Sequence, residues 1–284
     1  MAFGKKTEQK PEYVLGLDNT PVRNYDVYIM KPLEKMISFL AAFIVGALIG
    51  YLFYGGLAED EFGNPTQTTY ILDIVICGIV GTIAGKIFLK SRVESIINKR
   101  QSALRGQFRE LLDTLAASIA SGRNVHDAII GAYDDMGIIY SQDDYIMQEL
   151  MVIKRGMANS IAIEELLMDF GERSSIDDIK DFAGVFETCS KRGGNMKDII
   201  RTTQQILSEK MNVKENIVTV LSSSALEQKI MLIMPILIVV ILKTSDSGFS
   251  DNFKSSSGIV STTIAVLCFI GSYYLSKAIM KIKV

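Results

Sequence analysis

The sequence predicts an all-α integral membrane protein with four transmembrane helices and a compact cytoplasmic bundle of about six helices between spans 2 and 3. Three observations support this fold class. Many apolar residues gather in four blocks, whereas a soluble protein of 284 residues spreads them along amphipathic elements. The polar stretch between the second and third blocks has helical periodicity and contains no proline. Lysine and arginine concentrate on one predicted side of the membrane.

The apolar blocks have the length of membrane spans. A helix rises about 1.5 Å per residue, so crossing a hydrocarbon core of about 30 Å takes about 20 residues. The first and last blocks, 36–54 and 258–276, carry no charge, and the second carries only Asp73 and Lys86. The predicted transmembrane helices are 36–54, 70–89, 225–243 and 258–279.

The third block is the shortest of the four. Ile230–Leu242 gives only thirteen residues, so the span has to begin inside the last helix of the cytoplasmic domain. We expect Pro235 to kink this helix. The alternative is a short re-entrant segment, which would leave the C-terminus on the opposite side of the membrane.

Basic residues set the predicted orientation in the cytoplasmic membrane. Residues 1–35 are polar, so we expect no cleavable signal peptide and a cytoplasmic N-terminal segment. The 55–69 loop contains acids but no lysine or arginine, whereas basic residues precede the first span and follow the second and fourth. This pattern places both termini and the domain at 91–228 in the cytoplasm. Lys243 and Lys254 in the outer loop depart from the pattern, although Asp246 and Asp251 balance their charge.

Glycine pairs at helical spacing mark the first two spans. Gly46 and Gly50 lie in the first, and Gly81 and Gly85 in the second. Small residues four apart let helix backbones approach closely in lipid. The pairs therefore indicate either ordinary packing inside the membrane or a contact between protomers.

The cytoplasmic domain shows apolar stripes separated by glycine turns. A glycine closes one helix and an asparagine caps the next, with an aspartate three residues later that favours the helix dipole. The predicted turn and cap residues are Gly122, Asn124 and Asp127, a second copy at Gly193, Gly194, Asn195 and Asp198, and a looser copy at Gly156. The stripes are 104–119, 176–189 and a third at Met196, Ile199, Ile200, Thr203, Ile206 and Val213.

Charge is uneven within this domain. Residues 127–187 contain fourteen acids and four bases. This stretch is either a solvated acidic face or a docking surface for a basic partner, with Asp134, Asp135, Asp143 and Asp144 as candidates. The basic stretch after the second span is expected to lie against anionic lipid headgroups.

Catalytic motifs are missing from the sequence. The string 81–87 is one residue too short for a nucleotide-binding loop and lies inside a predicted span. The chain has one histidine, three unpatterned cysteines and no zinc-protease or serine-hydrolase motif. We therefore expect no enzyme, no catalytic residue, no metal, no cofactor and no nucleic-acid partner.

Two segments resemble the type II secretion system F domain. The run 111–122 looks like its opening helix, and Phe182, Phe186 and the following 191–195 resemble its second half, where a Gly-Gly turn precedes the last helix. Pro235 also lies where that family often has a proline. The resemblance covers about residues 100–240, and a single copy of the domain is similar to the platform proteins of tight-adherence (Flp-type) pili. Longer relatives in type II secretion and type IV pili carry two copies.

The resemblance implies a function and partners. Such platforms couple a hexameric secretion ATPase in the cytoplasm to the assembly of pilin or pseudopilin subunits, and pair with a paralogous platform or with themselves. The acidic surface and the glycine turns would then face the ATPase, and the glycine pairs would face pilins or protomers. The alternative is a four-span sensor or regulator with a cytoplasmic signalling bundle, although its outer loops would have only about fifteen residues each. A small transporter is a third reading, for which Asp73 and Lys86 lie too far apart, at about 20 Å.

Overall fold

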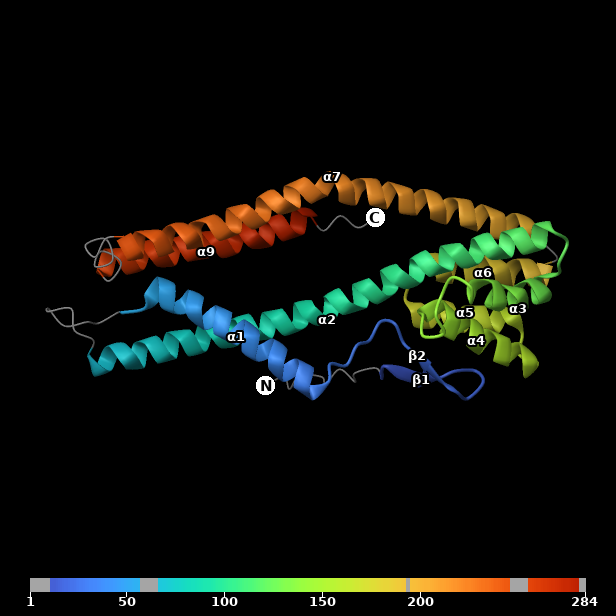
Figure 1. The fold of residues 1–284 in the computed structure, drawn as a ribbon, viewed down its shortest axis with the longest axis horizontal. Coiled ribbons are helices and arrows are strands. Elements are labelled where there is room, and N and C mark those ends of the chain that lie inside the picture. Colours follow the sequence, from blue (N-terminus) through green and yellow to red (C-terminus); the bar gives the residue numbers. More distant parts are fainter. Residues whose placement is uncertain (1–10, 57–65, 193–194, 246–254, 281–284) are drawn as a thin grey trace. The chain divides into compact units, whose positions relative to one another are not determined.

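Helices dominate the computed structural model, which describes residues 11–56, 66–192, 195–245 and 255–280 (Figure 1). The strands are β1 (Tyr13–Leu15) and β2 (Pro21–Arg23), and the helices are α1 (Pro32–Tyr54), α2 (Gln67–Ala120), α3 (Val125–Met136), α4 (Tyr145–Ala158), α5 (Ile163–Ser174), α6 (Asp177–Arg192), α7 (Met196–Ser245) and α9 (Ser256–Met280). The predicted all-α class is confirmed, with one short hairpin added near the N-terminus.

The chain divides into two compact units. Unit 1 comprises Met1–Ile29 and Val93–Asn212, and unit 2 comprises Met30–Arg92 and Val213–Val284. Two helices belong to both units, because α2 runs for 54 residues and α7 for 50 without a break in the helix. Two of the three boundaries between the units therefore fall inside helices, and the third, between Ile29 and Met30, falls in the segment before α1.

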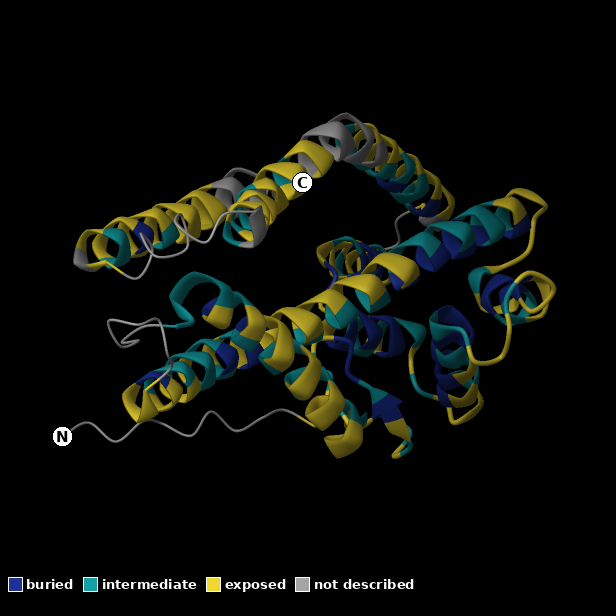
Figure 2. Cartoon of the chain, turned by 60° about the vertical axis from the view of Figure 1, so that its left-hand side comes forward, coloured by how far each residue is buried: buried dark blue, intermediate teal, exposed yellow. Residues whose placement is uncertain are grey.

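Unit 2 contains the apolar helices. Three helices are long and apolar enough to cross a membrane, within Pro32–Tyr54, Gln67–Ala120 and Ser257–Leu275. At most 11% of each apolar window is buried inside the structure, so most of these side chains need a nonpolar surrounding (Figure 2). The apolar part of α7 is not among these three helices, and several α7 side chains are outside the part of the chain that the structure describes. The third predicted span therefore stays a prediction.

Unit 1 has one apolar core made by consecutive helices. The predicted stripe on α2 is buried from Leu104 to Leu115, and the predicted stripe on α6 is buried from Ile179 to Phe186. On α7 the buried residues are Ile200 and Leu207, while Ile206 is 50% exposed. The third predicted stripe was therefore wrong at Ile206 and Val213, which are exposed because the helix turns Leu207 toward the core, whereas Thr203 is half-buried.

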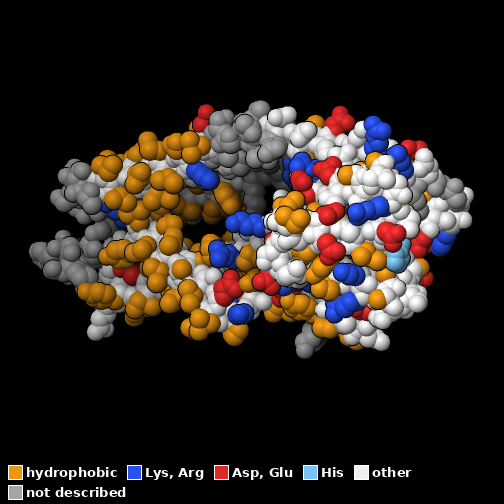
Figure 3. Space-filling view, turned by 45° about the vertical axis from the view of Figure 1, so that its right-hand side comes forward, with side chains coloured by type: hydrophobic (Ala, Val, Ile, Leu, Met, Phe, Trp, Pro, Cys, Tyr) orange, Lys and Arg blue, Asp and Glu red, His pale blue; other side chains and the backbone are white. Residues whose placement is uncertain are grey.

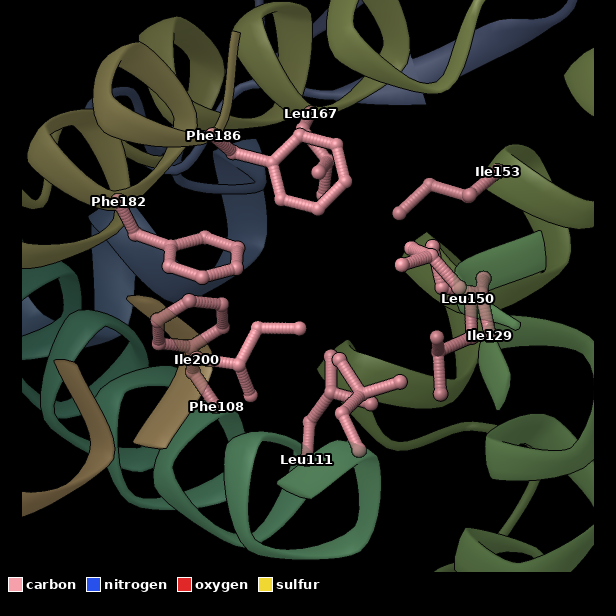
Figure 4. Close-up of a pocket in the computed structure, with 11 residues that line it drawn as sticks. Phe108, Leu111, Ile129, Leu150, Ile153, Leu167, Phe182, Phe186 and Ile200 are labelled. Carbon is pink, nitrogen blue, oxygen red and sulfur yellow. The ribbon is translucent and has the colours of Figure 1, made fainter. Parts of the chain in front are cut away.

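Aromatic and branched side chains fill this core. The Phe108 ring lies 6.1 Å from that of Phe170 and 5.5 Å from that of Phe182, both edge to face. Side chains from α2 to α7 converge on a remaining space of about 10 Å³ lined only by apolar groups (Figure 4). This space is about the size of one water molecule. The core of unit 1 is therefore closely packed and leaves no room for a ligand.

Candidate functional site

A hairpin precedes the first apolar helix. Strands β1 and β2 pair antiparallel with Val14 opposite Val22. The turn is held by Asp18, whose carboxylate accepts hydrogen bonds from the Thr20 backbone N–H at 3.1 Å and hydroxyl at 2.6 Å. Asn19 adopts the left-handed conformation with φ of 58°, which asparagine tolerates better than most residues. The one sequence signal for this hairpin was the Asp18-Asn19 turn between two short apolar runs, and the hairpin was not predicted.

Tyr25 anchors the hairpin segment in the core of unit 1. Its side chain is fully buried, and its ring packs edge to face on Tyr145 at 5.7 Å. Its backbone N–H donates to the Arg173 carbonyl at 3.0 Å, and its hydroxyl donates to Glu149 Oε1 at 2.9 Å. The segment before α1 is therefore part of the folded unit, joined to α4 and α5.

The hydroxyl of Tyr25 meets a buried ion pair. Arg173 donates to both carboxylate oxygens of Glu149, at 3.0 Å and 2.8 Å, and the two side chains are only 6% and 2% exposed. Its Nε donates to Asp169 at 2.7 Å, and Nη1 also donates to the Arg23 carbonyl at 3.1 Å. Such forked geometry gives strong, directional bonds and leaves neither buried charge unpaired.

Burial and charge shift the pKa values in this network. Burial raises the pKa of the Tyr25 phenol far above its usual range, and the negative charge of Glu149 raises it further. Burial alone would lower the pKa of Arg173, but its hydrogen bonds to Glu149 and the nearby carboxylates raise it overall. Tyr25 therefore stays neutral and Arg173 stays charged across the physiological range.

A second set of contacts joins the same segment to α2. Glu12 forms an ion pair with Arg100 at 2.9 Å, with side chains 18% and 13% exposed. The Arg100 guanidinium also lies over the Tyr28 ring, 4.6 Å from its centroid. The segment 12–28 thus contacts α2, α4 and α5, so the N-terminal segment and unit 1 lie on one side of any membrane that α1 and α2 cross.

The first predicted turn has the geometry of a capped helix start. Gly122 has φ of 95°, which is a left-handed conformation that glycine adopts easily. The Asn124 side chain accepts from the Asp127 backbone N–H at 2.8 Å, and its amide donates to the Asp127 carboxylate at 2.8 Å. The Asp127 carboxylate thus bonds the side chain of Asn124, whereas a capping box would bond its backbone.

The second predicted turn is described in part. The Asn195 amide donates to the Asp198 carboxylate at 2.6 Å, as in the first copy. Its side-chain oxygen accepts from the Lys197 backbone N–H at 3.2 Å. Gly193 and Gly194 lie outside the described residues.

Gly156 does not lie in a turn. It is a buried residue inside α4, two residues before the helix ends, and a side chain there would collide with Leu166 on α5. The left-handed residue of this connection is Ser160, with φ of 62°. The Gly156 carbonyl accepts the Ile161 backbone N–H at 3.0 Å, so this residue takes part in ending α4 from within the helix, and it is small because α4 and α5 approach closely at that point.

The four candidate acids differ in their surroundings. Asp134, Asp135 and Asp143 are exposed, whereas Asp144 is half-buried. The Asp144 carboxylate accepts from the Ser141 backbone N–H at 2.8 Å and from the Gln107 amide at 3.2 Å, so it holds the loop to α2. Figure 3 shows acidic and basic side chains interspersed on the face of unit 1 that it presents. The candidate acids for a docking surface are therefore the three exposed ones, Asp134, Asp135 and Asp143.

The four glycines of the predicted spans face the neighbouring helix within unit 2. A Cβ at Gly46 would lie 2.7 Å from that of Ala84 and 3.1 Å from the Cα of Gly81. Cβ atoms at Gly81 and Gly85 would lie 2.8 Å and 2.5 Å from the rings of Phe43 and Phe39, respectively. These small residues let α1 pack directly on α2, as in other close helix pairs in lipid. Their faces are thus occupied within one chain and not free for a protomer or pilin.

Pro235 lies inside α7, which continues on both sides of it. It lines an apolar cavity of about 510 Å³ within unit 2, together with side chains from α1, α2 and α9. Tyr54 and Thr263, near this cavity, form a hydroxyl contact of 3.1 Å between α1 and α9. The kink expected at Pro235 stays a prediction.

The described residues contain no group of three or more histidine, cysteine or acidic side chains that could hold a metal ion. No protein-family model, no curated protein and no solved structure matches the chain.

Proposed function

We propose that this chain is the cytoplasmic-membrane platform of a type IV-like, tight-adherence pilus or type II secretion machine. It does no bond chemistry itself and passes motion from a cytoplasmic secretion ATPase to pilin or pseudopilin subunits in the membrane. The observation that carries the proposal is the continuity of α2 and α7. Each helix has one part in unit 2 and another part in the core of unit 1.

The continuity of α2 gives it the properties of a mechanical connector. Its apolar segment and its core residues Leu104 to Leu115 belong to one uninterrupted helix, so no flexible linker separates them. Hydrogen bonds along a helix resist bending over several turns. A displacement or rotation of unit 1 would therefore move the apolar segment with it.

The N-terminal anchor supplies a third connection. Tyr25 is buried in unit 1, and α1 begins only seven residues later at Pro32. Seven residues reach at most about 25 Å when fully extended. All three of α1, α2 and α7 are thus tied to unit 1, by short tether or by continuous helix, which supports a coupling function more than a loosely attached binding domain.

Partner surfaces follow from exposure and polarity. The exposed acids Asp134, Asp135 and Asp143 suit a basic surface of the ATPase. The apolar cavity beside Pro235, of about 510 Å³, is large enough for a few side chains of a membrane-inserted pilin helix and too small for the helix itself. Pairing with a second platform, identical or paralogous, would use other faces of unit 2, because the glycine faces of α1 and α2 pack on each other.

The proposal is tested by interrupting α2. A six-residue Gly-Ser insertion between Arg92 and Val93 keeps both units but removes the continuous helix at their boundary. The variant should insert into the membrane and bind the ATPase, yet fibre assembly or secretion should fall to the level of a strain without the gene. The matched control places the same insertion in the 57–65 loop and should keep assembly. Wild-type assembly by the α2 variant would contradict the proposal.

A further inference from the structure

Two isoleucines at the tip of unit 1 are held in solvent. Ile138 is 86% exposed and Ile139 is 69% exposed, in the connection between α3 and α4. Among the residues that the structure describes, Ile138 has the largest exposed fraction of any large apolar side chain. The tip belongs to unit 1, whereas the apolar windows long enough to cross a membrane, among the described residues, lie in unit 2.

The backbone of this connection is well ordered by hydrogen bonds. Ile138 and Ile139 donate from their backbone N–H groups to Asp135 and Met136 at 3.3 Å and 3.0 Å, and Tyr140 donates to Met136 at 2.8 Å. Met136 is fully buried and Tyr140 packs against the core, so both ends of the turn are fixed. The two isoleucines are thus presented in one conformation, which lowers the entropy lost on binding.

Acidic side chains predominate around the tip. Asp134, Asp135 and Asp143 are exposed beside the isoleucines, and residues 124–153 contain no lysine or arginine. Two bases approach from outside this range: the Lys154 ammonium lies over the Tyr133 ring at 4.7 Å, and Arg109 on α2, which pairs with Glu110 at 2.9 Å, acts electrostatically on Tyr140. A complementary partner surface therefore has an apolar pocket with lysine or arginine on its rim.

We propose that the Ile138–Ile139 tip docks into an apolar, basic-rimmed pocket on the secretion ATPase. This inference rests on the proposed function and adds the contact that would supply most of the binding free energy between the platform and the ATPase. The isoleucines act as anchors that bury apolar surface, and the three aspartates steer the approach. The acidic docking surface expected from the sequence thereby becomes the rim of an apolar contact.

The test measures binding of the purified ATPase to the full chain in lipid nanodiscs. The double variant Ile138→Ser, Ile139→Ser should lower the affinity by roughly tenfold or more, since both anchors are removed. Asp134→Asn, Asp135→Asn, Asp143→Asn should slow association by about tenfold at low salt and flatten its salt dependence. Leu15→Ser, at a side chain that is 74% exposed on β1, is the matched control and should bind like the wild type.

The outcomes separate the two proposals. The tip contact is supported if the wild type and the Leu15→Ser control bind the ATPase and the isoleucine variant, at an unchanged melting temperature, does not. If the isoleucine variant binds the ATPase with the affinity of the wild type, the tip contact is overturned but the proposed function is not. A wild-type chain that does not bind the ATPase overturns both.

Discussion

At the scale of single residues, the buried pair Glu149 and Arg173 does most to fix the position of the N-terminal segment. Both charges lie in the interior of unit 1, where an unpaired charge is costly. Tyr25 and the Arg23 carbonyl complete their hydrogen bonds from the hairpin side. The ion pair therefore has full hydrogen bonding only while the hairpin is docked.

Removing one partner of this pair should destabilise unit 1. Glu149→Ala leaves the Arg173 guanidinium buried without its main counter-charge, which costs about 3–5 kcal/mol of unfolding free energy. Thermal unfolding in detergent, followed by circular dichroism, measures the change. Glu165→Ala, at an exposed carboxylate on α5, is the control and should change stability by less than about 0.5 kcal/mol. Equal melting temperatures for both variants would contradict the role of the pair.

The Tyr25 phenol should make the fold sensitive to alkaline pH. Its folded pKa is raised above the ordinary value of 10.0, so its contribution to stability is complete below pH 10 and is lost as the pH rises further. Tyr25→Phe should remove this dependence while costing about 1–3 kcal/mol at neutral pH, because Glu149 loses a hydrogen bond. Urea unfolding of the wild type and the variant at pH 8 and pH 10.5 measures both effects. The same alkaline slope in both proteins would assign it to other groups.

Residue-level expectations from the sequence held where one local bond decides the structure. The Asn124 cap needs only the Asp127 backbone three residues on, so local sequence contains the information. Gly156 is small because of Leu166, which comes from the next helix, and no local pattern reveals that contact. The network of Tyr25 and Glu149 joins residues 124 positions apart and could not be predicted from spacing.

At the scale of elements, the contact between α1 and α2 depends on four small residues. Gly46→Val would place its side chain against Ala84 and Gly81, forcing the two helices apart at a cost of about 1–3 kcal/mol. Gly78→Val on α2 is the matched control, because nothing lies within 4 Å of its Cβ position. The melting temperature of each variant in mild detergent measures the difference. A Gly78 variant that is equally destabilised would point to a general effect of valine in α2.

The helices with the most regular apolar pattern were the ones best predicted from the sequence. The stripes on α2 and α6 place every third or fourth residue on one face, and the structure buries the same residues. On α7 both Ile206 and Leu207 are apolar, so the pattern does not decide which one faces the core; contact with α6 does. Strands β1 and β2 are only three residues each, which is too short for a clear alternation.

At the scale of the whole molecule, the contacts of residues 12–28 constrain the topology. With single cysteines in a variant lacking Cys77, Cys189 and Cys268, an impermeant maleimide should label Glu61→Cys in intact cells. It should label Asp26→Cys and Glu172→Cys only after the membrane is permeabilised, since both positions belong to unit 1, which the proposal places in the cytoplasm. Labelling of Asp26→Cys and Glu172→Cys from different sides would contradict the hairpin contacts, and labelling of both from outside would reverse the orientation.

Composition predicted three long apolar helices of the described residues, and it left the apolar part of α7 undecided. Uncharged blocks of about 20 residues mark α1 and α9 because the hydrocarbon core sets the required length. The apolar stretch of α7 is shorter and continues a helix from unit 1, so composition alone does not decide whether it crosses.

The long sequence distance between Tyr25 and its partners also sets an order of events during synthesis. The hairpin emerges from the ribosome first, but α4 and α5 follow only after α1 and the apolar part of α2 have been made. A chain in which only one of α1 and α2 had crossed would hold Tyr25 and Glu149 on opposite sides of the membrane, so its unit 1 would stay open around an exposed ion pair. Completion of this contact thus distinguishes chains in which both helices have crossed from chains in which one has failed to insert.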